Sequence, residues 1–72
     1  MIRRFRLARA TYHEQLAEQH HNVVTSAVEL YEALGDTTDE AWQRVRALSS
    51  TDYHLAQTRL HANLSKLWHP DA

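Results

Sequence analysis

Glycine and proline interrupt regular structure more than any other residues, and each occurs only once in this chain of 72 residues. Gly35 lies at the midpoint and Pro70 lies near the end. The chain as a whole is rich in Ala, Leu, Glu, Gln and Arg, which favour helix. Because so few breakers allow long helices, the sequence predicts an all-α hairpin. We expect a helix over about 3–34, a turn over 35–37 and a helix over about 38–68.

The turn carries its own signals. Gly35 stands where a left-handed residue commonly ends a helix. Thr37 and Glu40 have the spacing of a capping box, which predicts that Thr37 is the N-cap of the second helix. Residues 49–51 read Ser-Ser-Thr, and such residues prefer caps and turns to helix interiors. A kink or break at 49–51 is therefore possible.

Apolar residues recur at helical spacing along both predicted helices. The first stripe consists of Phe5, Tyr12, Leu16, His20, Val23, Ala27, Leu30 and Leu34. The second consists of Ala41, Val45, Ala56, Leu60, Leu64 and Leu67. We expect these stripes to form the seam of the hairpin, with partners whose numbers add up to about 73. This register places Phe5 opposite Trp68 and Leu30 opposite Trp42.

The chain is one domain, residues 1–72, and a domain of this size buries too little surface to be very stable alone. Small domains often rely on disulfides, a metal or association, and there is no cysteine. Both helices carry more apolar surface than one seam uses. We therefore expect two hairpins to pair into a dimeric four-helix bundle. The predicted interface residues are Val24, Val28, Tyr31, Trp42, Leu48 and Leu55.

Six histidines are unusually many for this length, and two pairs have a spacing of seven: His13 with His20, and His54 with His61. If the second helix is continuous, its rotation places His54 and His61 on the solvent side, while His13 and His20 lie at the edge of the core. The two pairs are then not expected to face each other. We predict no metal site and no cofactor. Protonating all six histidines would change the formal charge from −1 to +5, which should weaken association near pH 5.

Basic residues are concentrated at the start of the chain, and they suggest a second kind of partner. Lys and Arg can bind the phosphates of nucleic acid or of anionic lipid. A break near Ser49 would also give the C-terminal half the outline of a helix-turn-helix. The candidate nucleic-acid-binding residues are Arg3, Arg4, Arg6, Arg9, Arg59 and Lys66. The alternative is that the four N-terminal arginines form a solvated, basic helix end, because helical projection spreads them around the circumference.

The chain has no phosphate-binding loop and no nucleophile motif, so we predict no catalytic residue and no enzyme activity. It has no apolar run of membrane-spanning length and no signal-peptide core, which favours a cytoplasmic protein. The leading hypothesis is a non-enzymatic interaction module that binds itself first and a heterologous protein second, as a small bacterial or phage accessory protein would. The alternative is a small nucleic-acid-binding regulator.

Overall fold

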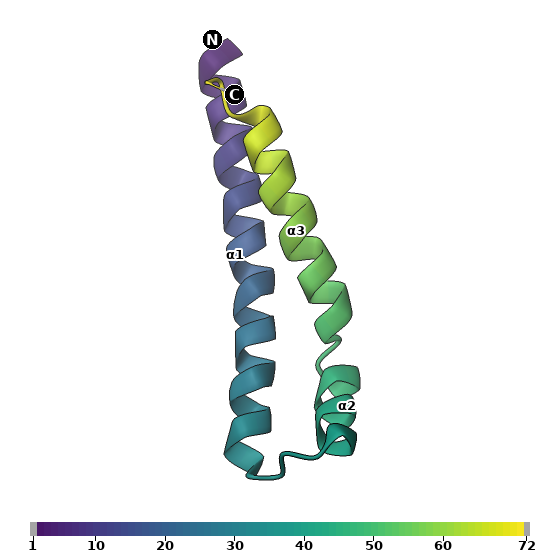
Figure 1. The fold of residues 1–72 in the computed structure, drawn as a ribbon. Helices are drawn as coiled ribbons and strands as arrows, with labels where there is room; N and C mark the ends of the chain where they lie inside the picture. The colour runs from purple at the N-terminus through teal and green to yellow at the C-terminus, as the bar shows by residue number, and fades with distance from the viewer. Residues whose placement is uncertain (1, 72) are drawn as a thin grey trace.

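The computed structural model describes residues 2–71, and these form three helices. Helix α1 (Ile2–Leu34) runs the full length of the molecule, and α2 (Asp39–Leu48) and α3 (Thr51–Trp68) follow one another along its side (Figure 1). The start of α1 and the end of α3 therefore lie together at one end of a rod measuring 53 × 16 × 16 Å. The predicted all-α hairpin is confirmed, and the first helix has nearly the predicted bounds.

The turn is built around Gly35, whose φ of +70° is the left-handed conformation expected of a helix terminator. Its N–H donates to the carbonyl of Glu32 at 3.2 Å. The predicted N-cap at Thr37 is wrong by one residue, because the Thr38 hydroxyl accepts the Ala41 N–H instead. The Asp36 carboxylate accepts the Thr38 N–H at 3.1 Å, and this turn delays the helix start to Asp39.

The second half of the hairpin is interrupted at Ser49 and Ser50, so the possible break is real and divides one predicted helix into two. Ser50 has φ 49° and ψ 43°, a left-handed conformation that is unfavourable for a residue with a Cβ atom. Arg46 and Asp52 bridge the break through two hydrogen bonds of 2.8 and 3.0 Å. The Asp52 side chain is 69% exposed and the Arg46 side chain is 40% exposed, so water screens this ion pair and it adds little stability by itself.

The break also changes which side of the helix faces α1. Val45 is buried in α2, and His54 in α3 contacts His20 of α1. These residues are nine apart, which is two and a half turns of a continuous helix and would place them on opposite sides. Since both face α1, the backbone at Ser50 has rotated α3 by about half a turn relative to a continuous helix.

None of the helices formed by residues 2–71 combines the length and the apolar character that a bilayer crossing requires.

Candidate functional site

Small and polar residues form the seam between α1 and α3. Ala10, His13 and Ala27 are buried on α1, and Thr51 is buried at the start of α3. The Ser65 hydroxyl crosses the seam and donates to the carbonyl of Ala10 at 2.8 Å. Small residues let two helices approach closely, so the seam is narrow and contains little apolar volume.

Four imidazoles lie at the centre of this seam, and we call them the histidine ladder: His13, His61, His20 and His54. The Nδ1 atoms of His13 and His61 lie 3.0 Å apart, and those of His20 and His54 lie 2.7 Å apart. Between the two pairs, the rings of His61 and His20 are parallel to within 1°, with centroids 5.8 Å apart. This ring contact joins the two hydrogen-bonded pairs into one row of four imidazoles.

The surroundings of His13 and His20 favour neutral imidazoles. Desolvation lowers the pKa of His13 below 6.5, and the nearby charges of Arg9 and His61 lower it further. Desolvation also lowers the pKa of His20, followed by repulsion from His54 and His61. His13 is only 5% exposed, and its Nε2 atom has no hydrogen-bond partner. A charge on this ring would consequently be poorly solvated.

The prediction that the two histidine pairs do not face each other is therefore wrong. It assumed that α2 and α3 are one helix with a single rotation, whereas the break at Ser50 turns His54 and His61 towards α1. His13, which was expected at the edge of the core, is buried in the seam. The predicted register nevertheless holds here, because the residue numbers of His20 and His54, and those of His13 and His61, each add up to 74.

The predicted apolar stripes are divided, because their small members Ala27, Ala41 and Val45 are buried whereas most of their large members are exposed. Phe5 and Leu34 are each 58% exposed, and Leu67 is 69% exposed. Helical rotation places these residues on one flank of the antiparallel pair, where they form an apolar surface that we call the leucine face. Its members are Phe5, Tyr12, Leu16, Val23, Leu30 and Leu34 on α1, Leu48 on α2, and Tyr53, Leu60, Leu64 and Leu67 on α3.

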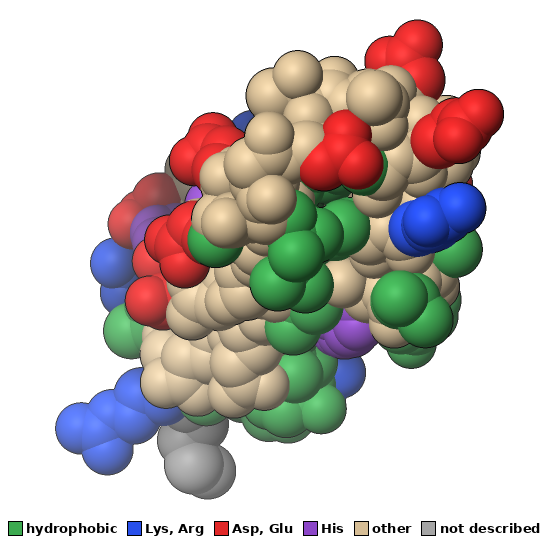
Figure 2. All heavy atoms as spheres, turned by 90° about the horizontal axis from the view of Figure 1, so that it is seen from below, with side chains coloured by type: hydrophobic (Ala, Val, Ile, Leu, Met, Phe, Trp, Pro, Cys, Tyr) green, Lys and Arg blue, Asp and Glu red, His purple; other side chains and the backbone are tan. Residues whose placement is uncertain are grey.

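Members of the leucine face on α1 contact the second half of the hairpin at both ends of the molecule. At the turn end, Leu30, Leu34 and Leu48 line one open groove. At the other end, the ring of Phe5 packs edge-on against Trp68, with centroids 5.7 Å apart. This contact confirms the predicted pairing of Phe5 with Trp68. Figure 2, which views the molecule from the turn end, shows hydrophobic side chains reaching the surface.

The residues predicted to form an interface are divided between two surfaces. Val28, Tyr31 and Trp42 line a second groove together with Glu32 and Asp39. Within it, the rings of Tyr31 and Trp42 pack with centroids 5.3 Å apart, one residue away from the predicted pairing of Leu30 with Trp42. Of the remaining predicted residues, Val24 and Leu55 are half-buried, whereas Leu48 is 87% exposed and belongs to the leucine face.

Three of the four N-terminal arginines contact the other end of the chain. Arg3 forms an ion pair with Asp71 at 3.1 Å, and Arg6 donates to the carbonyl of Leu67 at 2.7 Å. The guanidinium groups of Arg6 and Arg9 also lie over the ring of Trp68. These contacts join the N-terminal end of α1 to the C-terminal end of α3. The other candidate nucleic-acid-binding residues, Arg4, Arg59 and Lys66, are exposed.

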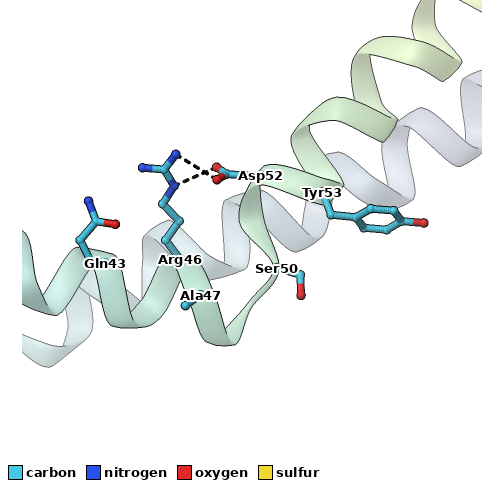
Figure 3. A pocket seen from close by; sticks show the side chains of 6 residues that line it. All are labelled: Gln43, Arg46, Ala47, Ser50, Asp52 and Tyr53. Carbon is cyan, nitrogen blue, oxygen red and sulfur yellow. Dashed lines mark hydrogen bonds and ion pairs between the residues drawn. The ribbon is translucent and has the colours of Figure 1, made fainter.

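A shallow groove follows the break between α2 and α3 (Figure 3). Gln43, Arg46, Ser50, Asp52 and Tyr53 line it, and the two dashed bonds between Arg46 and Asp52 close one side. Helices α2 and α3 continue in one direction along α1 (Figure 1). A helix-turn-helix crosses its two helices at a steep angle, so the structure does not have the arrangement that the break at Ser49 suggested.

In the part of the chain that the structure describes, no group of three or more His, Cys, Asp or Glu side chains is arranged to hold a metal ion. The ladder offers two separate pairs of imidazoles, and a stable zinc site needs at least three protein ligands. No family model matches the chain, and it has no match among curated proteins or solved structures.

Proposed function

We propose that this chain is a non-enzymatic helical interaction protein whose main partner is a second copy of itself. The two hairpins associate through the leucine face and form a four-helix bundle. The observation that carries this proposal is that large apolar side chains lie on one exposed flank and not in the seam. Such a flank is unfavourable in water.

The small core of the single hairpin supports the proposal. The buried apolar residues are Ala10, Ala27, Ala41 and Val45, and no large side chain among residues 2–71 is fully buried. Hydrophobic burial is the main favourable contribution to folding. A second hairpin would cover the leucine face and supply the apolar core that one hairpin lacks.

The exposed area also supports the proposal. The structure exposes 5526 Å², whereas a compact monomer of 8.4 kDa exposes about 4,600 Å². The excess of about 900 Å² is close to the roughly 800 Å² that each partner buries in a stable interface of standard size. A dimer through one face would therefore bring the exposed area of each chain to an ordinary value.

The test compares two leucines of nearly equal exposure. Leu60 is 47% exposed and lies on the leucine face, whereas Leu7 is 46% exposed and lies outside it. A dimer would place an Asp at position 60 in its core, so Leu60→Asp should weaken association by about 100-fold, which corresponds to about 3 kcal/mol. Leu7→Asp should leave association unchanged. Light scattering coupled to size-exclusion chromatography gives the mass of each variant, and circular dichroism confirms helicity.

The outcomes separate the possible surfaces. A wild-type mass of twice 8.4 kDa with a monomeric Leu60→Asp variant supports the proposal. A dimer that is lost in Val28→Asp but kept in Leu60→Asp would move the interface to the groove of Val28, Tyr31 and Trp42. A monomeric wild type at high concentration would overturn self-association and leave the leucine face for a different protein.

A further inference from the structure

Charge is strongly segregated along the rod. The end where the chain termini meet, residues 2–14 and 59–71, carries a formal charge of +4. The turn end, residues 29–52, carries −4. The basic end contains Arg3, Arg4, Arg6, Arg9, Arg59 and Lys66 with the acids Glu14 and Asp71, and the turn end contains Glu29, Glu32, Asp36, Asp39, Glu40 and Asp52 with the bases Arg44 and Arg46. Figure 2 shows acidic side chains gathered around the turn end.

We infer that the two hairpins in the dimer run in opposite directions, so that the basic end of each copy lies beside the acidic turn end of the other. This inference rests on the proposed self-association and adds its geometry. The result is an isologous dimer with a twofold axis across the middle of the rod.

The apolar residues alone do not determine this direction. The leucine face extends from Phe5 to Leu34 on α1 and from Leu48 to Leu67 on the other side, so it covers nearly the whole rod. Two such faces overlap fully in either direction. In the antiparallel dimer, Phe5 lies near Leu30 of the second copy and Tyr12 lies near Val23 of the second copy, because residues at about equal distances from the centre of α1 (Ile2–Leu34) meet.

Electrostatics distinguishes the two directions. The rod is 53 Å long and only 16 Å wide, so a neighbouring copy brings its ends far closer to the adjacent ends of its partner than to the opposite ones. A parallel dimer would place +4 beside +4 and −4 beside −4, whereas an antiparallel dimer forms two attractive contacts. The Debye length is about 8 Å at physiological salt and about 30 Å at 0.01 M, so the preference is greatest at low ionic strength.

Distances between spin labels on the two copies test the direction. The chain has no cysteine, so Ala8→Cys and Ala33→Cys, two exposed positions near opposite ends of α1, give unique labels. At about 1.5 Å per residue, the antiparallel dimer separates the labels by about 30–35 Å at position 8 and about 40–45 Å at position 33. A parallel dimer would bring them to about 20 Å or less at both positions.

The measured label distances and the mass together distinguish failure of the antiparallel arrangement from failure of self-association. Long distances at both positions, together with a dimeric mass, support the inference. Short distances at both positions would overturn it while leaving self-association intact. A monomeric mass with no intermolecular dipolar signal would instead overturn the proposed function, so the two failures are distinguishable.

Discussion

The Nδ1 atoms of His20 and His54 lie 2.7 Å apart across the seam, and this contact limits the protons that the pair can hold. At this distance one ring must donate an N–H and the other must accept it with a lone pair. The pair can therefore be neutral or singly protonated, but two imidazolium rings would present two N–H groups to each other. The same limit applies to His13 and His61, whose Nδ1 atoms are 3.0 Å apart.

We therefore expect stability to fall as the pH decreases through about 6.5. The folded-state pKa values of His13 and His20 are lowered from 6.5, so the unfolded chain binds more protons in this range, and stability rises with pH there. The stabilisation is fully present above pH 6.5 and is lost towards the lower folded-state pKa values. The measurement is the urea midpoint at pH 7.5, 6.5 and 5.5 and one chain concentration. Equal midpoints at all three values would contradict the prediction.

The control variants distinguish the contribution of the histidine ladder to the pH dependence of stability from that of the other histidines. Replacing His13 and His20 together by Leu should flatten the dependence of the urea midpoint on pH between pH 7.5 and 5.5, whereas His21→Leu, at an exposed position, should leave it unchanged.

Asp36 contributes to stability in a different pH range. Its pKa is lowered from 3.8 by the hydrogen bond from Thr38, so its contribution is present above pH 3.8 and is lost only in stronger acid.

Thr51→Val should stabilise the protein. Thr51 is 5% exposed, and its hydroxyl oxygen is buried without a hydrogen-bond partner. Valine has nearly the same shape and removes this unsatisfied group, so we expect a gain of about 1 kcal/mol in the free energy of unfolding. Thr58→Val is the matched control, because the Thr58 hydroxyl donates to the carbonyl of His54 at 2.8 Å. A gain in the control but none in Thr51→Val would refute this account of residue 51.

Ser50→Gly should also stabilise the protein. Glycine adopts the left-handed conformation of residue 50 without the steric cost that serine bears. After allowing for the greater entropy of glycine in the unfolded chain, we expect a gain of about 0.5–1 kcal/mol, or roughly 4 °C in Tm. Ser49 has φ −91° and ψ 0°, so Ser49→Gly should lower Tm. Thermal unfolding at equal chain concentrations compares the variants, and a lower Tm for Ser50→Gly would count against strain at the break.

The sequence was a good guide to the elements and their register. The single glycine predicted the end of α1, and adding residue numbers to about 73 correctly paired Phe5 with Trp68. Both results depend on chain connectivity and rise per residue. Neither is affected by the rotation of a helix about its own axis.

Rotation could not be predicted because one backbone conformation determines it. Ser50 is left-handed although serine rarely adopts this conformation, and nothing in its side chain signals it. The resulting half turn brings His54 and His61 inwards and Leu60 and Leu67 outwards. A continuous helix would have given the opposite assignment. The orientation of the two histidine pairs is therefore mispredicted because of this one residue.

Exchanging one charge between the two ends should weaken the dimer. Arg4→Glu combined with Glu29→Arg keeps the net charge at −1 but reduces the ends from +4 and −4 to +2 and −2. Both residues are exposed, so the fold should be retained. In an antiparallel dimer, attraction at both ends falls, and we expect the dissociation constant to rise about tenfold at low salt and much less at 0.5 M, where the Debye length is only a few ångströms. In a parallel dimer the same exchange relieves repulsion, and the dissociation constant would fall instead. Sedimentation equilibrium at the two salt concentrations therefore gives opposite signs for the two arrangements.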